Sequence, residues 1–187
     1  RAEAVQAAVG PVPAGPPGPK AHRHRPGPGG YAPPCLHPRR GRGQLSCVYT
    51  CCTEAFPNLF TFSDPAEAAW TGIHAAAADY DGFLRWAFNS WTARPLHDSR
   101  FRLFAAGDTY QVYPGPRSSI RFERLIEGLQ DAEKLRLLRE ELALRGERRK
   151  LERLNRAVEA FTPEGRKKQG RTAAEDVRAL SDLLNTL

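Results

Sequence analysis

Two short apolar runs, each followed by helix-start signals, constrain the fold of this chain more than any other feature. The runs are "SCVYTCC" at residues 46–52 and "FLRWAF" at residues 83–88. A strand–helix–strand–helix order predicts parallel strands, which need a crossover connection. A parallel sheet needs both faces covered, and two strands alone do not make one. The sequence therefore predicts either pairing with another chain or the C-terminal end of a larger α/β domain, and we favour the second.

Helices are predicted between and after these strands. Asp64 can act as an N-cap with Pro65 at the first helical position, which predicts a helix over residues 65–78. Ser118 or Ser119 can cap the helix after the second strand. Apolar periodicity and glycine stops place the later helices at residues 120–144, 148–161 and 173–184. The basic segment "PEGRKKQGR" separates the last two.

The first 45 residues differ in composition from the rest. Between residues 10 and 43, 18 of 34 residues are Gly or Pro, with almost no large aliphatic side chains. Such a segment cannot bury enough apolar surface to offset its ordering entropy, so we expect residues 1–45 to be disordered. The same composition arises when a GC-rich gene is translated in the wrong frame, and we favour this origin over a linker.

The basic charge lies in this tail. Seven Lys or Arg and one Glu give residues 1–45 a net charge of +6, out of a formal +7 for the 187-residue chain. An alternative function is therefore a non-enzymatic basic protein that binds nucleic acid through its Arg-rich tail. The segments with regular strand and helix patterns are nearly neutral, which argues against this alternative, so we predict no nucleic-acid partner.

The sequence has no apolar run long enough to span a bilayer, and we predict no membrane partner. Cellular location stays open.

The four cysteines do not have the spacing of a metal site. Cys35, Cys47, Cys51 and Cys52 contain no CxxC motif, and no His follows at a finger-like distance. Adjacent cysteines in a strand point to opposite faces and do not chelate together. We favour buried free thiols, with disulfides left open, and predict neither a metal nor another cofactor.

Aromatic, amide and acidic residues gather where the second strand meets a long loop. Period-two alternation separates two faces of this strand. We expect the apolar face, Leu84, Trp86 and Phe88, to pack on helices. The mixed face is expected to line a pocket and consists of Phe83, Arg85, Ala87, Asn89 and Trp91.

These residue types suit a sugar. An amide at Asn89 can bond hydroxyl groups, and the Trp91 indole offers a flat apolar face to a pyranose ring. Arg85 suits a ligand and a structural ion pair equally well, and Asp108 competes with a turn role. Tyr49 and Glu54 are weaker candidates, and no residue is predicted to be catalytic. The predicted substrate-binding residues are Arg85, Asn89, Trp91, Asp108, Tyr110 and Tyr113.

Four blocks in order carry a family resemblance: "YTCCTEAFPNLFTF", "DGFLRWAFNSW", "DSRFRLFAAGDTYQVYPG" and "RSSIRFERLIEGLQDAEK". They resemble the C-terminal end of the catalytic domain of glycoside hydrolase family 123, over residues 48–144. The resemblance implies an α/β fold, the last two βα units of a (β/α)8 barrel. Residues 46–146 would form this part of the catalytic domain, and residues 147–187 would add C-terminal helices.

The same resemblance implies an activity. The family includes β-N-acetylgalactosaminidases, in which the substrate's acetamido oxygen attacks its own anomeric carbon. An adjacent Asp-Glu pair orients the acetamide and protonates the leaving group, a departure from the two-carboxylate scheme. This sequence contains no Asp-Glu dipeptide. We therefore expect a fragment of a glycosidase, inactive alone, whose parent acts on N-acetylgalactosamine-type glycosides.

Overall fold

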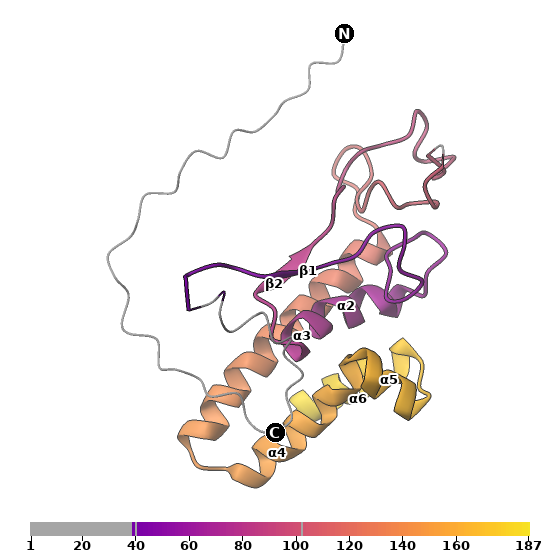
Figure 1. Cartoon of the computed structure of the whole chain (residues 1–187). Helices are drawn as coiled ribbons and strands as arrows, with labels where there is room; N and C mark the ends of the chain where they lie inside the picture. Colours follow the sequence, from indigo (N-terminus) through magenta and orange to yellow (C-terminus); the bar gives the residue numbers. More distant parts are fainter. Residues whose placement is uncertain (1–38, 40, 102) are drawn as a thin grey trace.

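The structure is a computed structural model and describes residues 39, 41–101 and 103–187. Most of the predicted tail therefore lies outside the described residues. Along the chain, the elements are β1 (Cys47–Tyr49), α2 (Pro65–Ala77), β2 (Gly82–Leu84), α3 (Ile120–Leu144), α4 (Arg148–Val158), η1 (Glu159–Phe161), α5 (Pro163–Gln169) and α6 (Ala173–Leu184) (Figure 1). The four predicted helices are present. The segment expected to separate the last two contains the short α5.

The two predicted strands pair in parallel. The register joins Cys47 to Gly82, Val48 to Phe83 and Tyr49 to Leu84. Both strands are shorter than the predicted ranges of 46–52 and 83–88. Over the described residues the sheet contains only these two strands, so no further neighbour extends the ladder at either edge.

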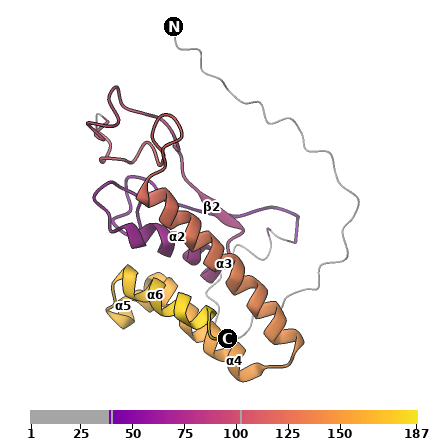
Figure 2. The ribbon, with the colours of Figure 1, turned by 180° about the vertical axis from the view of Figure 1, so that it is seen from behind.

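Helix α2 begins where the sequence predicted. The Asp64 carboxylate accepts a hydrogen bond from the Ala66 N–H at 2.9 Å, and Glu67 completes a capping box. Seen from behind, α2 lies between the sheet and the C-terminal helices, and α3 runs along it (Figure 2). The two helices touch through backbone, since a Cβ on Gly128 would lie 2.1 Å from the Ala69 carbonyl oxygen.

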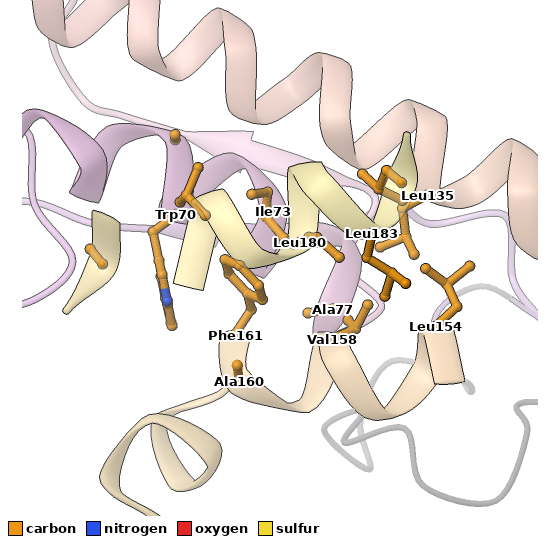
Figure 3. Close-up of a cluster of buried hydrophobic side chains, with 14 of the residues drawn as sticks. Trp70, Ile73, Ala77, Leu135, Leu154, Val158, Ala160, Phe161, Leu180 and Leu183 are labelled. Atoms are coloured by element: carbon orange, nitrogen blue, oxygen red, sulfur yellow. The ribbon is translucent and has the colours of Figure 1, made fainter. Parts of the chain in front are cut away.

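The main apolar core lies on the side of α2 away from the strands (Figure 3). Trp70 and Ile73 of α2 meet Phe161 of η1, and α3, α4 and α6 add leucines. These buried leucines are Leu135, Leu142, Leu154, Leu180, Leu183 and Leu184. The C-terminal helices therefore share one core with α2 and α3.

The cysteines near β1 are free, as favoured from the sequence, but they are not buried. Cys47 and Cys52 are exposed and Cys51 is half-buried. Cys47 lies in β1, whereas Cys51 and Cys52 follow the end of this strand. Within the described ranges, no helix is both long and apolar enough to cross a membrane.

Candidate functional site

Arg85, the first residue after β2, joins the carboxyl ends of both strands to the long loop. Its guanidinium donates to the Asn58 Oδ1 at 2.9 Å and to the Thr50 hydroxyl at 3.3 Å. It also forms an ion pair with Asp108, and the two side chains are 5% and 0% exposed. Three chain segments therefore meet at one buried cation.

Local backbone geometry places Asp108 there. Gly107 precedes it with a φ of 81°, a conformation that favours glycine. A Cβ at Gly107 would also lie 2.6 Å from a Thr61 methyl carbon. Burial raises the pKa of the Asp108 carboxyl, while Arg85 opposes this shift. Arg85 and Asp108 therefore form a buried ion pair, which is the arrangement that one of the two roles considered for Arg85 requires.

The other predicted residues meet in a second cluster on the long loop. Asn89 and Tyr110 form an antiparallel bridge, and the Trp91 indole N–H donates to the Val112 carbonyl at 2.8 Å. Tyr110 is fully buried, with its ring 5.4 Å from that of Tyr113 and edge-on to it. Asn89 and Trp91 remain exposed. Two of these side chains can therefore reach a ligand, and Tyr110 supports them.

The predicted facing of the second strand is wrong. Phe83 packs on Leu59, Ala68 and Leu125, and Ala87 is buried, so the first part of the mixed face turns toward the helices, whereas Asn89 and Trp91 at its end do not. On the apolar face, Leu84, Trp86 and Phe88 are exposed by 56%, 42% and 49%. Of the three, Phe88 keeps a helix contact, because its ring lies 5.4 Å from that of Phe122 in α3. Alternation separated the two faces, but α2 and α3 cover the face that carries Phe83.

The open face brings forward residues that the sequence assigned to packing. Tyr49 of β1, opposite Leu84 in the register, is also 46% exposed. Together Tyr49, Leu84 and Trp86 form what we call the open aromatic face. A signal for it existed in the sequence, since large aromatic rings at the carboxyl ends of strands suit a site as well as a core.

The remaining candidates have local partners. Glu54 accepts hydrogen bonds from the Cys51 N–H at 2.7 Å and the Thr53 hydroxyl at 2.8 Å, and the former lowers the pKa of its carboxyl. Glu54 is therefore an ionised acceptor that holds its own loop. Among the described residues, no three His, Cys, Asp or Glu side chains are placed to hold a metal ion.

The long loop also carries a cleft of about 310 Å³. Its lining residues are Thr92, Ala93, Arg94, His97, Asp98 and Arg100. None of the six predicted substrate-binding residues lines this cleft. The six predicted residues therefore lie outside this cleft, around the ends of the strands and in the long loop.

Parallel strands whose carboxyl ends carry aromatic and hydrogen-bonding side chains are typical of α/β enzymes. The model of the glycoside hydrolase 123 catalytic domain matches residues 30–138, more than half of the chain, and the chain belongs to this family. The match takes in residues 30–45, which the resemblance in the sequence blocks did not reach. Among curated proteins, a sequence search found no match.

A solved structure agrees with this assignment. The chain superposes on a family 123 glycoside hydrolase from Clostridium perfringens, described for its glycolipid glycan hydrolysis, with a TM-score of 0.66 and 23% identity. The similarity covers 80% of this chain and 28% of that one. At this identity the comparison establishes a shared fold, and the chain spans less than a third of the relative's length.

Proposed function

We propose that this chain supplies the C-terminal βα units of a glycoside hydrolase that cleaves terminal N-acetyl-β-galactosaminides. The observation that carries the proposal is the family match over residues 30–138. The polar support at the strand ends agrees with it, because Arg85 and Asp108 hold the loops there.

The open aromatic face supports a barrel. In a (β/α)8 barrel, helices cover the outside of the strands and side chains of the inner face fill the interior. Here α2 and Leu125 of α3 cover the face that carries Phe83, while Tyr49, Leu84 and Trp86 are exposed on the other. We propose that this face lines the inside of a barrel whose remaining strands come from sequence beyond these 187 residues.

We assign two roles to the predicted residues. Asn89, Trp91 and Tyr113 contact the sugar, with Trp86 as an added platform. Arg85, Asp108 and Tyr110 are buried, and they position the strand end and the loop. An indole ring provides an apolar face on which a pyranose ring can stack. An amide side chain provides a donor and an acceptor for the hydroxyl groups of the sugar.

The proposed mechanism is substrate-assisted and retaining, with the acid and the acetamide-orienting carboxylate supplied by an Asp-Glu pair. The sequence of this chain contains no Asp-Glu dipeptide. The chain alone should therefore not hydrolyse an aryl N-acetyl-β-galactosaminide, because general acid catalysis is worth about 10²- to 10⁴-fold by itself. Turnover at an ordinary enzymatic rate would show that the acid lies within these residues.

Ligand binding tests the site apart from the chemistry. We expect saturation-transfer NMR to detect N-acetylgalactosamine on the full chain, with weaker signals for its C4 epimer N-acetylglucosamine. Trp86→Ala should reduce the signal and exposed Leu129→Ala should not. Equal signals for all variants and both sugars would contradict the assigned surface.

A further inference from the structure

Two cysteines are adjacent in the sequence just after the carboxyl end of β1. Cys51 and Cys52 follow Tyr49 by two and three residues, and both are free. Cys52 is exposed and Cys51 is half-buried. The strand has ended before them and the chain bends at Cys52 and Thr53, so the alternation that separates adjacent strand side chains does not apply.

The fold holds Cys51 at its backbone and at its sulfur. Its N–H donates to the Glu54 carboxylate at 2.7 Å, and its carbonyl accepts from the Asn58 Nδ2 at 2.6 Å. The Cys51 Sγ lies 3.5 Å from the Thr53 hydroxyl oxygen. This first thiol therefore has a fixed position, while its exposed neighbour is open to reagents.

The electrostatic surroundings assign different roles to the two sulfurs. Hydrogen bonding by Thr53 lowers the pKa of the Cys51 thiol, and Cys52 adds to the shift. A lower thiol pKa increases the thiolate fraction, and the thiolate is the nucleophile. Burial raises the pKa of the Cys52 thiol. Cys51 is thus suited to attack first, and Cys52 to act second and resolve the product.

We propose that Cys51 and Cys52 form a redox-active dithiol that closes to a disulfide between adjacent residues by exchange with a low-molecular-weight disulfide. The Cys51 thiolate attacks one sulfur of the external disulfide, forming a mixed disulfide and releasing one thiolate. The Cys52 thiolate then attacks the Cys51 sulfur and releases the second thiolate. The protein loses two electrons and two protons, and the external disulfide becomes two thiols.

The dithiol is connected to the buried support of the candidate site. Asn58 donates to the Cys51 carbonyl and accepts from the Arg85 guanidinium at 2.9 Å through its other side-chain atom. Oxidation at Cys51 and Cys52 therefore acts on a loop that is one side chain removed from Arg85. The proposal stands without the glycosidase assignment, because it needs only the thiols and their loop.

The test uses the full chain with Cys35→Ser and Cys47→Ser, which leaves Cys51 and Cys52 as its cysteines. The folded protein is incubated with oxidised glutathione, treated with N-ethylmaleimide and weighed by intact mass spectrometry. We expect the mass to fall by two hydrogens, with neither glutathione nor maleimide attached, and reduction to restore two maleimide sites. Persistent glutathione adducts or two maleimide adducts before reduction would overturn the proposal.

Further variants separate positioning by the fold from simple adjacency. With Cys51→Ser or Cys52→Ser in the same background, the remaining thiol should keep glutathione as a mixed disulfide. In guanidinium chloride the contacts that hold Cys51 are lost, so mixed or intermolecular disulfides should replace the ring. Ring closure to the same extent in denaturant, or a Cys47–Cys51 linkage in the unsubstituted chain, would contradict the structural argument. Circular dichroism checks that each variant is folded.

Discussion

The Arg85 guanidinium meets the Asp108 carboxylate in the interior of the protein, with 5% and 0% of the two side chains exposed. Arg85 also bonds Asn58 and Thr50, so the pair links the end of β1, the loop after it and the long loop after β2. Removing one partner of such a pair leaves an uncompensated buried charge. The strand ends should therefore depend on both residues together.

Asp108→Asn tests this dependence. The change leaves the Arg85 charge without its carboxylate, so we expect the free energy of unfolding to fall by about 3–5 kcal/mol. The combined Arg85→Met and Asp108→Leu variant should lose less than the sum of the two single changes, because neither charge is then left alone. Denaturant unfolding followed by circular dichroism measures Asp108→Asn, the two single changes Arg85→Met and Asp108→Leu, and the combined variant.

An exposed ion pair provides the matched control. Asp98 and Arg100 contact each other at 2.8 Å, but their side chains are 45% and 79% exposed. Asp98→Asn should cost less than about 1 kcal/mol, since water screens this pair. If Asp108→Asn were as mild as Asp98→Asn, Asp108 would have no structural role and its assignment as a positioning residue would fail.

Gly128→Ala tests the contact between α2 and α3. The added Cβ would lie 2.1 Å from the Ala69 carbonyl oxygen, which is backbone and cannot turn aside. We expect a loss of at least about 1–3 kcal/mol from overpacking, against a gain of about 1 kcal/mol in helix propensity. Exposed Gln130→Ala on the same helix should leave the melting temperature nearly unchanged. An increase in melting temperature for Gly128→Ala would mean that the helices are further apart than described.

Much of the fold could be predicted from the sequence because its signals are local. Asp64 and Pro65 set the start of α2, and Ser119 caps α3 by accepting from the Phe122 N–H at 3.2 Å. Parallel pairing followed from the order of strands and helices. Strand length could not be predicted, because it depends on neighbours that β1 and β2 lack over the described residues.

The candidate site was predictable in part for the same reason. Sequence reasoning found Arg85 and Asp108, but their contact spans 23 residues and has no local pattern. Period-two alternation also separated the two faces of the second strand. We then expected helices to cover the face with Leu84, whereas they cover the face with Phe83. The apolar content of a strand does not say which of its two faces a helix covers, so Trp86 was predicted to pack on a helix although it is 42% exposed.

Trp70 and Trp86 should respond oppositely to truncation. Trp70 is 1% exposed and packs against Phe161 in the main core, whereas Trp86 is 42% exposed on the open aromatic face. Trp70→Ala should cost about 3–5 kcal/mol of stability. Trp86→Ala should cost much less while weakening the binding of N-acetylgalactosamine. Thermal melting and ligand-observed NMR on both variants check this, and a large drop in melting temperature for Trp86→Ala would restore the packing role first predicted for it.

His74 should make stability depend on pH in mildly acidic solution. Its ring stacks on Trp70, and its Nδ1 lies 2.6 Å from the Phe161 carbonyl oxygen. Burial lowers the pKa of His74, and the Phe161 contact opposes this shift without reversing it. The unfolded chain binds a proton near the ordinary His pKa of about 6.5, so it takes up the proton before the folded protein does. The stabilising contribution is therefore complete above about pH 6.5 and is lost as the pH falls toward the lower folded-state pKa.

We expect His74→Asn to reduce the fall in melting temperature between about pH 7.5 and pH 5, whereas the exposed His97→Asn should leave that fall unchanged. A pH dependence that survived His74→Asn and disappeared in His97→Asn would place the titrating group on the long loop instead.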